Sequence, residues 1–80
     1  MLLATTGRWS AEVSEASPAD AGPPCRAWIH DGGHRVIGRG AGETRSEAAL
    51  AAVTDASARC VEFRGRPAAA ITAVLSRMTL

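Results

Sequence analysis

The residue types best suited to metal binding lie in one short turn sequence, His30-Asp31-Gly32-Gly33-His34. A hairpin at this point could bring two imidazoles and a carboxylate together. A zinc site, however, uses at least three protein ligands, and the chain has no other histidine. We therefore predict an ordinary polar turn, with no metal and no cofactor.

A glycine-rich stretch, Gly38-Arg39-Gly40-Ala41-Gly42-Glu43-Thr44, falls between a predicted strand and a predicted helix. Its backbone amides could bind a phosphate at the helix N-terminus. It lacks the Gly-Lys-Ser/Thr ending of a P-loop, and the carboxylate of Glu43 would repel an anion. The stretch therefore indicates a tight strand-to-helix connection.

A cysteine, a histidine and an acidic residue, the types used in nucleophilic catalysis, are all present. Cys25 and Cys60 lie in apolar patterns, which favours buried, reduced thiols. The histidines fall at a hairpin tip, and no spacing links a nucleophile to a base and an orienting group. The sequence therefore predicts no catalytic residue and a protein that is not an enzyme.

The strongest candidate for binding is a surface that combines tryptophan with arginine. If Cys25–His30 and His34–Arg39 pair around an Asp31-Gly32 turn, Ala27 faces Val36 and Cys25 faces Gly38 on the core side. Trp28 then lies on the opposite side of the sheet. Tryptophan and arginine dominate binding hot spots and stack on nucleic-acid bases. The residues that we predict to bind a partner on this outer face are Arg26, Trp28, Arg35, Ile37 and Arg39.

Two alternatives for Trp28 remain open. The second helix or the long loop could cover its ring and make it part of a second core layer. Trp28 could also stack under Arg35 as a local cation–π pair. A shift of one residue in the strand register would exchange the two faces of the hairpin.

Composition predicts one small globular domain over residues 1–80. The chain is 46% hydrophobic and 21% charged, without an apolar run near the ~20 residues of a membrane span. Its start lacks the features of a secretory signal, so we expect a cytoplasmic protein that does not contact membranes. The net charge of +1 is too small to indicate general nucleic-acid affinity. All nine basic side chains are arginines, which suit bidentate recognition.

The elements expected around these residues form an α+β domain. Period-two alternation over Arg8–Glu15 places Trp9, Ala11 and Val13 on the core side of a strand. Three prolines make residues 16–24 a long loop, and we assign no element to residues 1–7, which can be flexible. A three-stranded antiparallel sheet results. The expected helices are an alanine-rich one from Arg45 to about Cys60, started by a Thr44/Glu47 capping box, and a C-terminal amphipathic one after Pro67.

The spacing of small and apolar residues predicts which faces of the two helices are buried. Ala49, Ala52, Val53, Ala56 and Cys60 share one helix face, whose small side chains let the helix lie close to the sheet. The segment Val61-Glu62-Phe63 is either a short strand or an extended link. In the second helix the apolar stripe is Ile71, Val74, Leu75 and Met78.

The segment Gly40-Ala-Gly42-Glu-Thr44-Arg45-Ser46-Glu47-Ala48, with Ala52, Val53 and Ala56 beyond it, resembles the strand-to-helix junction of double-stranded RNA-binding domains. This resemblance implies a βββα arrangement and makes Arg45 a candidate phosphate-binding residue. Ser46 and Ala49 stand where the family has further lysines, which weakens the implied RNA binding. Antitoxins with a partial version of this fold share the Gly-x-Thr-x-x-Glu-Ala helix start.

A second resemblance covers about the last fifty residues. Asp31-Gly32, Val36-Ile37-Gly38-Arg39, the alanine-rich helix and Arg77-Met78 are similar to a group of small phage anti-CRISPR proteins that act on type I-F systems. This resemblance implies a non-enzymatic inhibitor, present in the cytoplasm of a host bacterium, that docks on the CRISPR effector complex as a monomer or weak homodimer. The expected function is accordingly such an inhibitor. The alternatives are a nucleic-acid-binding module and an antitoxin-type regulator.

Overall fold

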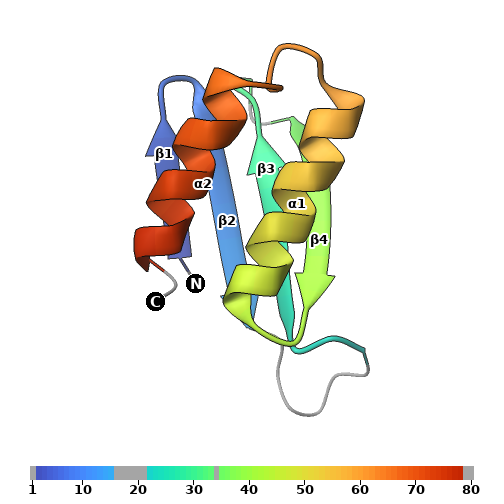
Figure 1. The fold of residues 1–80 in the computed structure, drawn as a ribbon. Coiled ribbons are helices and arrows are strands. Elements are labelled where there is room, and N and C mark those ends of the chain that lie inside the picture. Colours follow the sequence, from blue (N-terminus) through green and yellow to red (C-terminus); the bar gives the residue numbers. More distant parts are fainter. Residues whose placement is uncertain (1, 16–21, 34, 79–80) are drawn as a thin grey trace.

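The computed structural model describes residues 2–15, 22–33 and 35–78, without the side chains of Leu2 and Met78. A four-stranded antiparallel sheet has the order β1-β2-β3-β4, and two helices follow it in the chain. Both helices lie on the same face of the sheet (Figure 1). The strands are β1 (Leu2–Thr6), β2 (Trp9–Glu15), β3 (Cys25–His30) and β4 (Val36–Gly42), and the helices are α1 (Arg45–Arg59) and α2 (Arg66–Met78).

The predicted α+β class is confirmed, but the predicted number of strands is wrong. Residues 2–6, for which the sequence predicts no helix or strand, form the edge strand β1 and pair with β2 over five residues. The two strands join through Gly7 and Arg8, and Gly7 has a positive φ of 57°. A glycine adopts this left-handed conformation without a steric penalty, so the chain can turn back within two residues.

The inner face of the sheet carries the alternate side chains expected of half-buried strands. Trp9, Ala11 and Val13 of β2 are buried as predicted, and Cys25, Ala27 and Ile29 of β3 continue the same layer. Helix α2 packs mainly on β1, and α1 packs mainly on β4 and β3. The apolar core therefore lies between one sheet face and the two helices.

Helix α1 approaches β4 very closely because both contact surfaces lack bulk. Gly38, Gly40 and Gly42 occupy the inner positions of β4, and a Cβ atom on Gly40 would lie 2.2 Å from the backbone nitrogen of Ala52. The facing helix residues Ala48, Ala52 and Ala56 recur every four positions and are fully buried. Of the predicted small-residue face, Ala49, Ala52, Val53 and Ala56 are buried, whereas Cys60 is only half-buried and Ala48 joins the face instead. The glycines belong to the strand, however, and do not form a separate link to the helix.

The start of α1 matches half of the predicted capping box. The Thr44 hydroxyl accepts a hydrogen bond from the Glu47 amide at 3.1 Å, as expected for an N-cap. The Glu47 carboxylate accepts from the amide of Glu43 at 2.8 Å, one residue before the Thr44 amide that we predicted. Two amides near the helix N-terminus are therefore satisfied by side chains.

The predicted register of the β3–β4 hairpin is wrong. Ala27 pairs with Gly40 and Cys25 with Gly42, because the loop is longer than the two residues assumed. The Asp31 carboxylate accepts hydrogen bonds from the amides of Gly33 and Arg35, at 2.9 and 3.1 Å, and these bonds hold the longer loop together. A register shift next to His30 then brings Ile29 opposite Gly38 on the core face.

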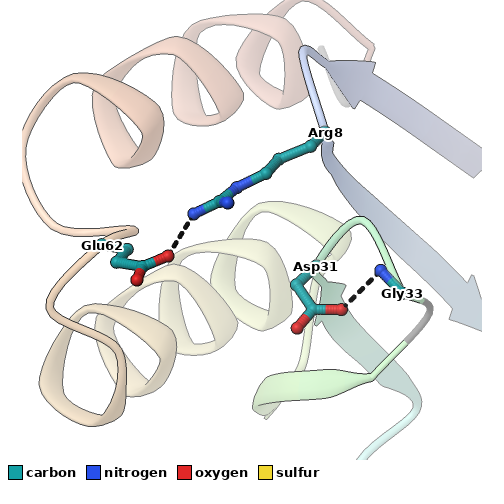
Figure 2. A network of polar contacts seen from close by, with 4 residues as sticks. All are labelled: Arg8, Asp31, Gly33 and Glu62. Atoms are coloured by element: carbon teal, nitrogen blue, oxygen red, sulfur yellow. Dashed lines mark hydrogen bonds and ion pairs between the residues drawn. The ribbon is translucent and has the colours of Figure 1, made fainter.

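The connection between α1 and α2 is a series of turns, so the predicted strand or extended link at 61–63 is wrong. Phe63 is completely buried and meets the ring of Trp9 edge-on, with 5.2 Å between ring centroids. The Arg8 guanidinium lies over the Trp9 ring, with 4.4 Å between its Cζ atom and the ring centroid. Figure 2 shows its guanidinium extended toward Glu62, with which it forms an ion pair. Arg8 therefore connects the β1–β2 turn to the α1–α2 connection through its ion pair with Glu62.

In α2 the expected stripe is largely present. Ile71 and Leu75 are buried and Val74 is partly buried against the core. The side chain of Met78 lies outside the described part of the structure, as do residues 16–21 of the predicted long loop.

Candidate binding face

The outer face of the sheet, which we term the open face, is covered by neither helix (Figure 1). The strand registers place a continuous row across it at mid-height, with Glu12 opposite both Leu3 and Trp28, and Trp28 opposite Arg39. Trp28 therefore lies near the centre of the face. The outward-facing residues of the open face are Leu3, Thr5, Ser10, Glu12, Ser14, Arg26, Trp28, His30, Val36, Arg39 and Ala41.

Trp28 is half-buried by its neighbours and keeps part of its ring accessible. Its indole N–H has no hydrogen-bond partner within the described segments. The alternative in which Trp28 stacks under Arg35 is not observed; among the described residues, the cation–π contact is that of Arg8 over Trp9. The described helices lie on the opposite side of the sheet, so the second-helix cover considered for Trp28 is also excluded.

Two guanidinium groups flank Trp28. Arg39 stands directly opposite it on β4, where cross-strand Cβ atoms lie about 5 Å apart, and Arg26 is the next outward residue on β3. Both side chains are exposed, and neither forms an ion pair with any residue the structure describes. Arg26, Trp28, Arg39, Gly40 and Ala41 line a wide, shallow hollow on this half of the face.

The other half of the open face has a different character. Glu12 and His30 approach each other, with 3.9 Å between the His30 Nε2 and a Glu12 carboxylate oxygen. Leu3 on β1 is 62% exposed and has Glu12 as its cross-strand neighbour. The face is therefore basic and aromatic over β3 and β4, and acidic and apolar over β1 and β2. Leu3 is not expected here because the sequence predicts no strand at residues 2–6. Glu12 lies on the outward side of a predicted strand but has no feature that singles it out for binding.

The structure separates the other predicted partner-binding residues from this centre. Ile37 lies at the register shift and is partly buried against the core, so little of its side chain is available. Arg35 is exposed but belongs to the loop before β4. Arg45 begins α1, and its Nε donates to a Glu15 carboxylate oxygen at 2.7 Å. Of the predicted set, Arg26, Trp28 and Arg39 share one surface.

A second hollow lies along β4 beside the end of α1, and its carboxylates, those of Asp31, Asp55 and Glu62, already have partners. The Asp55 carboxylate accepts from the Arg39 amide at 2.9 Å and from Arg59 Nε at 2.9 Å. These bonds lower the pKa of Asp55, the Arg39 amide contributing most. The amides of Arg35 and Gly33 likewise lower the pKa of Asp31. Carboxylates with lowered pKa are weak bases at neutral pH.

An apolar cleft lies between the two helices. It is lined by both, with Leu50 on α1 and Thr72 and Leu75 on α2 among its walls. Its volume of about 180 Å³ is below the roughly 300–1,000 Å³ of typical ligand pockets. The cleft is too small to enclose a substrate of ordinary size.

The turn that was considered for metal binding is described only in part, and the two cysteine thiols lie apart from the open face. His34 lies outside the described residues, and the described residues hold no cluster of three or more potential metal ligands. Cys25 is buried, and its sulfur lies 3.9 Å from the carbonyl oxygen of Glu43. Cys60 is only half-buried, at the C-cap of α1. Both thiols are free.

No protein-family model, curated protein or solved structure matches this chain. Among the described residues, neither helix has both the length and the apolar character needed to cross a membrane.

Proposed function

We propose that this protein is a non-enzymatic inhibitor that binds a protein partner through the open face. The observation that carries the proposal is the central, half-buried Trp28 with the guanidinium groups of Arg26 and Arg39 beside it, both without an ion-pair partner among the described residues. Interfaces are enriched in tryptophan and arginine, and their strongest contacts cluster near the centre. The site residues of the proposal are therefore Arg26, Trp28 and Arg39.

The chemistry of the face points to a partner that presents carboxylates around an apolar pocket. A guanidinium binds a carboxylate through two parallel hydrogen bonds, and both arginines have this capacity unused within the described structure. The Trp28 ring would fill the pocket between the two ion pairs. The resemblance to anti-CRISPR proteins makes the type I CRISPR effector complex the first partner to test.

A protein surface fits the open face better than nucleic acid does. Neutralising a phosphate backbone requires an extended track of basic groups. Here Glu12 lies beside Trp28 in the same row, and the net charge of the chain is only +1. A phosphate strand that crossed the face would therefore meet a carboxylate within one strand of the arginines.

The polar geometry also favours binding over catalysis. The carboxylates of the β4 hollow are used in structural hydrogen bonds, and the pKa values of Asp31 and Asp55 are lowered. A general base works best with a pKa near the operating pH, which for a carboxylate requires the opposite shift.

The test measures cleavage of target DNA by a purified type I-F effector complex and its nuclease, with and without this protein. Wild-type protein should co-elute with the complex and reduce cleavage. Trp28→Ala and the double variant Arg26→Glu/Arg39→Glu should each weaken binding about 30-fold or more, as a hot spot of at least ~2 kcal/mol would. Arg66→Glu is the matched control, because Arg66 is exposed at the start of α2, on the helix side of the sheet.

Each outcome bears on a different part of the proposal. Unchanged cleavage in the presence of wild-type protein would refute the anti-CRISPR function. Inhibition that survives both open-face variants, with circular dichroism showing an intact fold, would refute the assignment of the face. A gel shift of single-stranded DNA or double-stranded RNA at about 0.15 M salt would instead support nucleic-acid binding.

A further inference from the structure

The two edges of the sheet are protected to very different degrees. Edge strands expose unpaired amide and carbonyl groups, and natural proteins usually protect them with charges, bulges or covering groups. On β4 the outward amide of Arg39 donates to the Asp55 carboxylate at 2.9 Å. The same strand has a register shift next to its start and an arginine at its centre. Another strand could not pair with β4 without displacing Asp55.

Strand β1 has none of these protective features. Its sequence, Leu-Leu-Ala-Thr-Thr, contains no charge, proline or glycine, and its pairing with β2 is uninterrupted over five residues. No other described segment forms backbone hydrogen bonds with its outer edge. Leu3, at 62% exposure, extends the apolar surface beside that edge on the open face.

From this contrast we infer that the β1 strands of two copies of this protein pair in an antiparallel arrangement and form one eight-stranded sheet. A second copy suits this edge because an antiparallel pair of identical strands is two-fold symmetric, so each copy uses the same surface. Two uncharged strands also meet without like-charge repulsion, which would oppose pairing between charged edges. The inference does not depend on the proposed function.

The size of the contact predicts a weak dimer. A five-residue edge together with Leu3 buries much less than the roughly 1,200–2,000 Å² of a stable specific interface. We therefore expect a dissociation constant between about 10 μM and about 500 μM. The two-fold axis would be perpendicular to the sheet and pass between the two β1 strands. Both open faces would therefore lie on one side of the dimer, and all four helices on the other.

Sedimentation equilibrium of the full chain, from about 10 μM to 1 mM, tests the inference. Wild-type protein should change with concentration from the 8.3 kDa monomer toward twice that mass. Leu3→Lys places a charge at the edge of each copy and should remain monomeric. Leu50→Lys is a matched control, because Leu50 is 61% exposed but lies on α1, and this variant should dimerise like the wild type.

A second β1 variant keeps the inference testable if Leu3→Lys fails to fold. Thr5 is exposed on β1, so Thr5→Lys should also abolish the dimer while the circular dichroism spectrum stays unchanged. A wild-type chain that remains monomeric up to about 1 mM would overturn the inference, as would a dimer that tolerates both β1 variants or that is lost in Leu50→Lys. The cleavage assay above measures the proposed function separately, since the variants at Arg26, Trp28 and Arg39 lie away from β1.

Discussion

Replacing Gly40 by alanine tests how closely α1 approaches the sheet. The added Cβ atom would lie 2.2 Å from the Ala52 nitrogen and 2.4 Å from the Ala48 carbonyl oxygen. Ordinary contacts of carbon with other heavy atoms begin at about 3.5 Å. The helix must therefore move away from β4 by roughly 1 Å or more. Because both clashing atoms belong to the helix backbone, no side-chain rotation can relieve the overlap.

The expected cost follows from what α1 contributes to the core. Five of its residues are buried, and all of them lose contacts if the helix moves outward. Overpacking typically costs about 1–3 kcal/mol and sometimes more, and the rigid backbone contact places this site at the upper end, about 3 kcal/mol. For a domain of this size, that loss corresponds to a fall in Tm of about 12–24 °C.

Thermal and urea unfolding, followed by circular dichroism, measure the effect. Gly33→Ala is the control, because its Cβ would lie at an ordinary 3.5 Å from the Asp31 carboxylate and its φ is not positive. We expect the control to change the free energy of unfolding by less than about 0.5 kcal/mol. If Gly40→Ala is as stable as Gly33→Ala, the close glycine–alanine contact between β4 and α1 is refuted.

Three further predictions concern other parts of the fold. Phe63→Ala should lower the free energy of unfolding by about 3–5 kcal/mol, because a completely buried ring is lost; a urea titration that shows less than ~1 kcal/mol would contradict its place in the core. Thr44→Ala should cost about 1 kcal/mol through loss of the N-cap, measured in the same titration. The pKa of Asp55 lies below 3.8, so its carboxylate stabilises the fold above about pH 3.8, and this stabilisation is lost as the pH falls through the folded-state pKa. The stability difference between wild type and Asp55→Asn should therefore be constant near neutral pH and shrink on acidification below about pH 3.8, as acid titrations at fixed urea would show.

Sequence patterns are sufficient to predict those parts of the fold that depend only on residues close together in the chain. The alternation of Trp9, Ala11 and Val13 specifies a strand with one buried face, and the Thr44 side chain specifies where α1 begins. The small residues of α1 also indicate close packing on the sheet, and the glycines of β4 are the partners that allow it. These features depend on residues a few positions apart in the chain.

The errors arose where distant contacts or turn chemistry decide the outcome. The two-residue Asp-Gly turn was a reasonable expectation, but the Asp31 carboxylate organises a longer loop by accepting two amides, and this changes the register. Phe63 lies in a turn and is buried only because Trp9, far away in the sequence, provides a ring to pack on. Gly7 is a turn signal at the end of β1. The five residues of β1 do not alternate between polar and apolar types, so the sequence gives no other indication of a strand there.

The candidate site was predictable in composition but not in arrangement. Arg26 and Trp28 follow from the alternation in β3, whereas their relation to Arg39 depends on a register that the sequence did not specify. The same register moves Ile37 toward the core, and Arg45 is engaged by Glu15.

Hydroxyl-radical footprinting of the protein, alone and with the type I-F effector complex, tests the role of the open face most directly. Trp28 is accessible in the free protein, and Leu50, 61% exposed on α1, serves as an internal reference on the helix side. Docking through the open face predicts that oxidation of Trp28 falls several-fold on complex formation while oxidation of Leu50 is unchanged. Protection of Leu50 with unchanged oxidation of Trp28 would contradict it.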